Sequence, residues 1–151
     1  MLYCESEEEF DAEILTVSPS ELEEIDESGL FEFEWTKEEG NQIYKIVKTK
    51  QLSPLGLISI VEFPLESRIH IDLLENSIEN QGKNKKIDGI AGCLIAFAVK
   101  LSFDKGYLGC TSLIPKTELI DLYVERYGFS QFGRQLAIEG TDALQLIHKY
   151  L

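Results

Sequence analysis

The sequence predicts an α+β (α/β-like) fold in which a mixed sheet of about six or seven strands is flanked by helices. Short apolar segments, alternating or continuous and separated by turn residues, fill residues 30–75 and predict sequential strands. A longer apolar segment, residues 89–104, is typical of a buried helix. It stands between two predicted strands, and this order implies a parallel or splayed strand pair with a right-handed crossover.

The length and the net charge of the chain limit the number of domains and the kinds of partner. A chain of 151 residues is long enough for one well-filled domain and short for two, so we expect a single domain over residues 1–151. The net charge of −13 argues against nucleic acid as a partner, because that surface needs a basic stripe. Residues 1–39 carry a net charge of −14 and residues 40–151 a net charge of +1. The acidic segment serves either solubility or the attraction of a cationic substrate or partner.

The cysteines and the apolar segments bear on location. Cys4, Cys93 and Cys110 show no CxxC spacing, which favours free thiols in a reducing cytoplasm and no metal site. The N-terminus lacks the basic and apolar regions of a signal peptide. The longest apolar run, Ile87–Val99, is too short to span a bilayer. We therefore expect a cytoplasmic protein with no membrane partner, and the sequence leaves open whether it forms a homodimer.

The first elements follow from local patterns. Phe10–Val17 is expected to form a short strand. Residues 18–21 (SPSE) predict a helix start, with Ser18 as the N-cap and Glu21 closing a capping box. This helix is expected to run to about Glu27 and to end before Gly29.

Four strands are expected next. The first alternates strictly, with Phe31, Phe33 and Trp35 on one face, which predicts a half-buried strand. The third is more continuously apolar and therefore more central. The four segments are Leu30–Trp35, Gln42–Thr49, Leu55–Phe63 and Arg68–Glu75.

The second half of the chain alternates helices and strands. A polar loop over residues 76–88 precedes the helix at 89–104. The remaining expected elements are a strand at Tyr107–Ile114, a helix from about Pro115 to Tyr127 ended by Gly128, a strand at Gly133–Ile138, and a helix at Thr141–Leu151 with Thr141 as N-cap.

One stretch carries a chemical motif. Lys83, Lys85 and Lys86 precede a glycine-bearing turn that leads into the apolar helix. The N-terminus of a helix offers backbone N–H groups and the positive end of the helix dipole, which together suit a phosphate. The nucleotide patterns G-x-x-x-x-G-K-[ST] and G-x-G-x-x-G are both absent. The stretch therefore predicts a phosphate site of another kind, most simply one for the pyrophosphate of coenzyme A, although an ordinary solvated lysine loop is the alternative.

The order of elements and two motifs resemble the GNAT (Gcn5-related) N-acetyltransferases. In that family a strand is followed by the pattern Q/R-x-x-G-x-G/A and a helix, and residues 86–91 (KIDGIA) fit it with lysine in the first position. A second family motif ends a helix with L-Y-x-K-x-G-F, and residues 122–129 (LYVERYGF) are similar to it. Tyr123 lies five residues before Gly128, whereas the family's tyrosine lies four before its glycine. The likeness covers roughly residues 30–139.

The resemblance implies a strongly twisted sheet with the acyl-coenzyme A site at the splay between its fourth and fifth strands. It implies acetyl-CoA as the cofactor and a small-molecule or peptide amine as the substrate. The cofactor-binding residues it implies are Leu73, Leu74, Lys86, Ile87, Gly89, Ile90, Ala91 and Gly92.

Acyl transfer to an amine needs a group that removes a proton from the ammonium and one that protonates the leaving thiolate. Glu75 is the first candidate for the base, with Asp72 and His70 second. Tyr123 is the candidate acid, with Tyr127 or water as alternatives, and a packing role for Tyr123 remains open. The function expected is N-acylation of a primary amine. The alternative is a catalytically silent GNAT-fold module that binds coenzyme A or a protein through its acidic N-terminal half.

Overall fold

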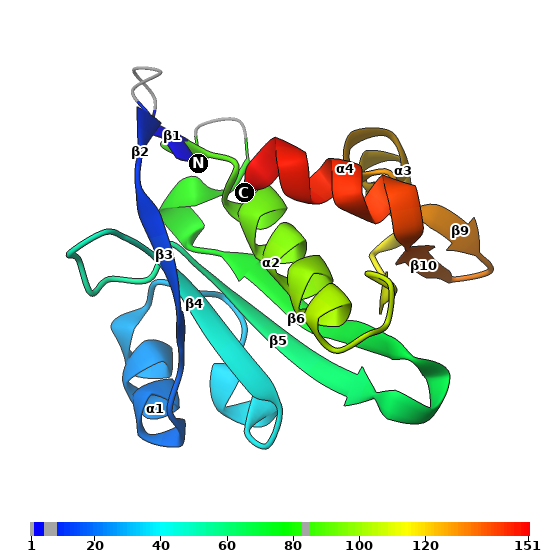
Figure 1. Ribbon diagram of the computed structural model, residues 1–151. Coiled ribbons are helices and arrows are strands. Elements are labelled where there is room, and N and C mark those ends of the chain that lie inside the picture. The colour runs from blue at the N-terminus through cyan, green and yellow to red at the C-terminus, as the bar shows by residue number, and fades with distance from the viewer. Residues whose placement is uncertain (1, 5–8, 83–84) are drawn as a thin grey trace. The chain divides into compact units, whose positions relative to one another are not determined.

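The computed structural model describes residues 2–4, 9–82 and 85–151, so Lys83 lies outside the described residues. Its larger sheet has seven strands, of which β3, β4, β5 and β6 are labelled in Figure 1, and a smaller sheet has the order β2-β1-β7. This sheet combines the parallel pair of β6 and β8 with antiparallel pairs such as β3 with β4 and β8 with β10, which confirms the predicted mixed sheet and its strand number. In sheet order the seven strands are β3 (Ala12–Thr16), β4 (Gln42–Lys48), β5 (Gly56–Phe63), β6 (Arg68–Asn76), β8 (Thr111–Leu113), β10 (Gln135–Ile138) and β9 (Ser130–Phe132). The smaller sheet contains β2 (Glu9–Phe10), β1 (Leu2–Cys4) and β7 (Ile87–Asp88).

The chain forms two compact units. The first comprises Met1–Ser59 and Leu73–Leu94, and the second comprises Ile60–Asp72 and Ile95–Leu151. The long helix α2 (Ile90–Asp104) begins in the first unit, one residue after the predicted position. In the part of the chain that the structure describes, no helix combines the length and the apolar character that a membrane crossing would require.

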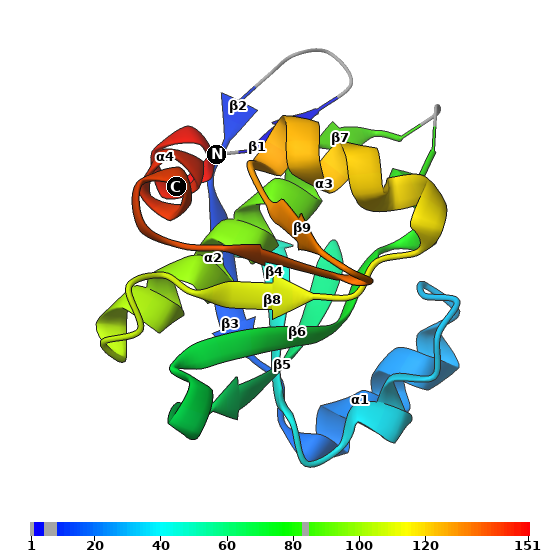
Figure 2. The ribbon, with the colours of Figure 1, turned by 90° about the vertical axis from the view of Figure 1, so that its right-hand side faces the viewer.

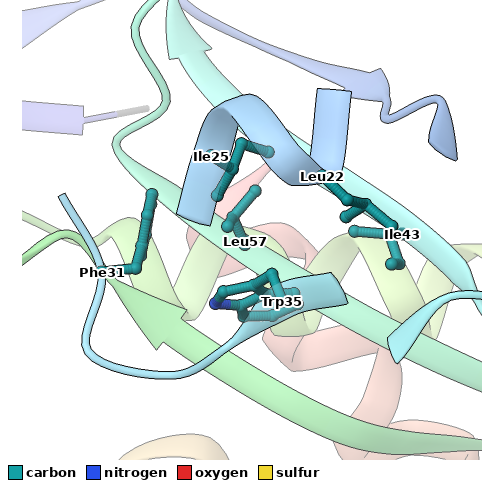
Figure 3. Close-up of a cluster of buried hydrophobic side chains, with 6 residues drawn as sticks. All are labelled: Leu22, Ile25, Phe31, Trp35, Ile43 and Leu57. Atoms are coloured by element: carbon teal, nitrogen blue, oxygen red, sulfur yellow. The ribbon is translucent and has the colours of Figure 1, made fainter. Parts of the chain in front are cut away.

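The first unit is built around α1 (Pro19–Ser28) and a buried apolar cluster (Figure 3). The Ser18 N–H donates to the Glu21 carboxylate, and Gly29 ends the helix at φ 72°, as the capping pattern predicts. Two residues of α1, Leu22 and Ile25, face inward at helical spacing. The cluster consists of Leu22, Ile25, Phe31, Trp35, Ile43 and Leu57.

The predicted strand at Leu30–Trp35 is wrong. The segment is irregular and leads into a 3₁₀ turn, η1 (Trp35–Glu38). Its backbone N–H groups bind carboxylates instead of a neighbouring strand, since those of Glu32 and Phe33 donate to Glu75. Phe33 is 47% exposed, although the alternating pattern placed it on the buried face.

The second unit contains the antiparallel strands β8, β10 and β9, which lie side by side in Figure 2. A 3₁₀ turn, η4 (Thr117–Leu119), leads into α3 (Ile120–Tyr127), which ends at Gly128 as predicted. The predicted strand at Tyr107–Ile114 shortens to β8, because Leu108 and Gly109 both adopt positive φ.

Two boundaries differ in the last part of the chain. The strand predicted at Gly133–Ile138 is confirmed as β10, which begins two residues later, and a turn at Gly133, whose φ is 65°, joins it to β9, a strand that was not predicted. The last helix, α4, runs over Gly140–Tyr150 with Glu139 as the N-cap in place of Thr141.

Candidate functional site: the turn that starts α2

The turn before α2 leaves backbone donors at the helix start. Gly89 has φ 90°, a conformation that glycine adopts without strain. The first helical hydrogen bond runs from the Cys93 N–H to the Gly89 carbonyl, at 3.0 Å. The N–H groups of Ile90, Ala91 and Gly92 precede that bond and so have no intrahelical acceptor. Their dipoles and the helix dipole favour an anion there.

Close packing fixes where this helix begins. Ile90 and Leu94 are fully buried, and both approach Gly56 at the start of β5. A Cβ on Gly56 would lie 2.6 Å from Ile90 Cγ2 and 3.1 Å from Leu94 Cδ1. Only glycine at position 56 therefore lets the first turn of α2 approach the strand this closely. Local sequence patterns gave no signal for this role.

Two other amides of the turn already have acceptors. The Ile87 N–H donates to Asn80 Oδ1 at 3.1 Å, and the Gly89 N–H donates to Asp88 Oδ1 at 3.0 Å. The predicted cofactor residues thus fall into two groups. Ile87 and Gly89 shape the turn, whereas Ile90, Ala91 and Gly92 carry the N–H groups without an intrahelical acceptor.

The two described lysines of the motif face carboxylates. Lys85 Nζ lies 2.8 Å from Asp88 Oδ1, and Lys86 Nζ lies 3.8 Å from Glu79 Oε2. The side chains of Lys86 and Glu79 are 64% and 54% exposed. Such solvated pairs contribute little to stability and exchange readily with other charges.

Strand β6 extends beyond the end of its parallel partner, β8. The register with β8 joins Ile69–Ile71 to Thr111–Leu113, where β8 ends, while β6 continues to Asn76. Leu73 and Leu74 lie in this continuation and are half-buried. The side chain of Leu73 packs against the apolar cluster of the first unit.

Glu75 is enclosed by hydrogen-bond donors. Its side chain is buried, with 5% exposed. Oε2 accepts from the Glu32 N–H at 2.7 Å, and Oε1 accepts from Trp35 Nε1 at 2.9 Å and from the Phe33 N–H at 3.3 Å. A buried carboxylate with these donors anchors the irregular segment at residues 31–35 to β6. Its role as general base stays a prediction.

Tyr123 belongs to the second unit and stands in an aromatic group on α3. Its ring centroid lies 5.6 Å from that of Tyr127 and 5.8 Å from that of Phe129. Burial raises the pKa of Tyr123, and burial raises the pKa of Tyr127 to about 12. Both hydroxyls therefore keep their protons at neutral pH, as a proton donor must.

His70 and Ser112 form a polar contact in the second unit. His70 Nδ1 lies 2.8 Å from Ser112 Oγ, and Arg68 Nη1 lies 3.3 Å from the same ring nitrogen. Because a guanidinium can only donate, Nδ1 acts as an acceptor and the ring is neutral. Burial and the Arg68 charge lower the pKa of His70, against an opposing effect of Asp72. Burial raises the pKa of both Cys93 and Cys110, which keeps these thiols protonated and poorly nucleophilic.

Comparison with solved structures gives whole-chain similarities. The spermidine/spermine N-acetyltransferase SpeG from Vibrio cholerae matches with a TM-score of 0.64 and 16% identity over 89% of this chain and 95% of that chain. The IAA acetyltransferase from Bacillus cereus matches with a TM-score of 0.60 and 17% identity, over 85% and 99% of the two chains. Nourseothricin acetyltransferase matches with a TM-score of 0.60 and 12% identity, over 85% and 98%. Neither the protein-family models nor the curated protein sequences give a match.

Proposed function

Because the chain has the fold of the GNAT N-acetyltransferases, we propose that it is an N-acyltransferase that uses acetyl-CoA or another acyl-coenzyme A and acts on a primary amine. The observation that carries the proposal is the start of α2. Three N–H groups there have no intrahelical acceptor, and the Gly89 turn and Lys86 adjoin them. This donor set suits a pyrophosphate.

Two groups of residues are proposed to bind coenzyme A. The N–H groups of Ile90, Ala91 and Gly92 donate to phosphate oxygens, and Lys86 contributes positive charge. The backbone of Leu73 and Leu74, beyond the registered pairing with β8, is the proposed partner of an extended ligand arm. Bound acyl-coenzyme A supplies the activated acyl group.

Two proton transfers are assigned to side chains. Glu75 is the proposed acceptor of the ammonium proton, directly or through water, and its three hydrogen-bond donors hold it in place. The Tyr123 hydroxyl, which is protonated at neutral pH, is the proposed proton donor to the leaving thiolate; burial raises its pKa and so makes it a weaker acid than an exposed tyrosine. Water or Tyr127 is the alternative donor.

The acceptor is proposed by class only. SpeG is a spermidine/spermine N-acetyltransferase, and a cationic acceptor would be attracted by the acidic residues 1–39 of this chain. We propose that residues 1–151 act as a single domain. We also propose a cytoplasmic location, because three cysteines without CxxC spacing favour a reducing compartment.

Calorimetry with coenzyme A and a thiol-release assay with a panel of amines test the proposal. We expect coenzyme A to bind, and acetyl-CoA to release thiol only when a suitable amine is present. Glu75→Gln should then lower turnover while coenzyme A affinity holds. Absence of coenzyme A binding would contradict the proposed function. Binding without turnover for any amine would favour the silent module.

A further inference from the structure

We propose that Asn80 is a positioning residue for the phosphate-binding turn, an inference that rests on the coenzyme A site proposed above. Asn80 ends a short 3₁₀ turn, η3 (Ile78–Asn80), and only 1% of it is exposed. It lies in the loop that the sequence showed only as polar. The side chain acts on the site through another residue, Ile87.

The Asn80 amide joins two segments. Its Oδ1 accepts from the Ile87 N–H at 3.1 Å, and its Nδ2 donates to Ser77 Oγ at 2.8 Å. The Asn80 N–H also donates to the Ser77 carbonyl at 2.9 Å. A buried amide that uses both its donor and its acceptor fixes the distance between its partners.

Ser77 is itself anchored to the sheet. It is 1% exposed, and its N–H donates to the Leu55 carbonyl at 2.9 Å. Leu55 adjoins Gly56, the residue against which Ile90 packs. The same two residues, 55 and 56, therefore hold both sides of the turn. Through Ser77, Asn80 holds β7 at Ile87, and Gly56 packs against the start of α2 at Ile90.

Loss of the Asn80 side chain releases the turn on its Ile87 side and leaves the packing of Ile90 against Gly56 in place. The Ile87 N–H loses its acceptor, while the start of α2, the pairing of β7 with β1 and the Gly89–Asp88 hydrogen bond remain. The N–H groups of Ile90, Ala91 and Gly92 remain present, but the turn beside them no longer has a fixed position relative to a bound phosphate. The expected effect is a loss of affinity specific to phosphorylated ligands.

The experiment compares coenzyme A with pantetheine, which lacks the phosphates. Asn80→Ala should lower coenzyme A affinity about tenfold in calorimetry, and pantetheine affinity, measured by competition, should stay unchanged. Gln81→Ala is the matched control, because Gln81 follows Asn80 directly and its side chain donates to the Asn76 carbonyl at the end of β6. Ser77→Ala removes the hydroxyl that accepts from Asn80 Nδ2 while leaving the Asn80–Ile87 bond, and it should give a smaller loss of the same kind.

Two results overturn the inference by itself. One is wild-type coenzyme A affinity in folded Asn80→Ala. The other is an equal loss for coenzyme A and pantetheine, which would indicate a general structural role. If Asn80→Ala does not fold, Ser77→Ala decides by the same comparison. A wild-type protein that does not bind coenzyme A would overturn the proposed function, and this inference with it.

Discussion

The charges around the Gly89 turn compete at the scale of single residues. Lys86 faces Glu79 in an exposed pair, so a phosphate at the start of α2 would have to share or replace that carboxylate. The lysine proposed to assist a phosphate thus already lies close to an acidic side chain.

Opposite effects on coenzyme A binding are therefore expected for the two partners. Lys86→Ala should weaken binding, and Glu79→Gln should strengthen it, each by about twofold to fivefold, because exposed pairs are worth up to about 1 kcal/mol. Calorimetry at low and high salt checks this, and both effects should shrink with added salt. Lys83→Ala should cost less than Lys86→Ala. The reverse order would refute the alignment of Lys86 with the basic position of the motif.

The Tyr123 hydroxyl gives a second prediction at this scale. Tyr123→Phe keeps the ring contacts with Tyr127 and Phe129 and removes only the hydroxyl. If Tyr123 is the acid, turnover should fall about a hundredfold while coenzyme A affinity holds within a few-fold. Tyr127→Phe is the control and should leave turnover near that of the wild type. Unchanged turnover in Tyr123→Phe would identify Tyr123 as a packing residue.

The geometry of the turn before α2 belongs to the scale of elements. Gly89→Val forces a β-branched residue to positive φ and crowds the N–H groups that follow. We expect coenzyme A affinity to fall at least about tenfold, since the phosphate would lose its approach to the helix start.

The control for Gly89→Val is Gly82→Val. Gly82 also has positive φ, at 71°, and a Cβ there would meet no atom within 4 Å. Both variants should lower the melting temperature, but only Gly89→Val should lower affinity. Equal affinities in the two folded variants would place the phosphate site elsewhere.

The parallel pair of β6 and β8 carries a pH-dependent contribution to stability. The pKa of His70 is lowered in the folded chain, so folding favours the neutral ring that accepts from Ser112 and Arg68. This stability is fully present above the unfolded pKa, about 6.5 for histidine, and is lost as pH falls from there toward the lower folded pKa. Denaturant unfolding between pH 7.5 and pH 5 should show this loss.

Replacing each histidine with glutamine tests whether His70 causes the loss of stability at low pH. His70→Gln should remove most of the pH dependence in this window, whereas the same change at the exposed His148 should leave it in place. A pH dependence that survives His70→Gln would assign it to other groups.

At the scale of the whole molecule, the two compact units either unfold together or unfold separately. Trp35, the sole tryptophan in the sequence, reports on the first unit, while α3 and α4 contribute to the far-UV circular dichroism from the second. If residues 1–151 act as a single domain, the fluorescence and dichroism transitions should coincide in urea. Separate midpoints would indicate that the two units unfold independently.

Local patterns in the sequence determined the elements whose causes are local. The capping residues at Ser18 and Glu21 start α1, positive-φ glycines end α1 and α3, and the apolar run before Asp104 forms α2. The resemblance of residues 86–91 and the order of elements anticipated the fold. The phosphate motif drew attention to Gly89, because glycine and lysine act there through backbone conformation and charge.

Tertiary contacts decided the rest, because they join residues far apart in the chain. Alternation predicted a strand at residues 30–35, but Glu75 and Asp26 capture its N–H groups and leave no ladder to form. Asn80 and Gly56 gave no signal in sequence, since the bond to Ile87 and the contact with Ile90 exist only after the loop folds onto β5. The sequence by itself thus predicted a segment for a phosphate. Only the folded structure decided which amides of that segment keep no intrahelical acceptor, because hydrogen-bond partners are assigned by packing and not by spacing.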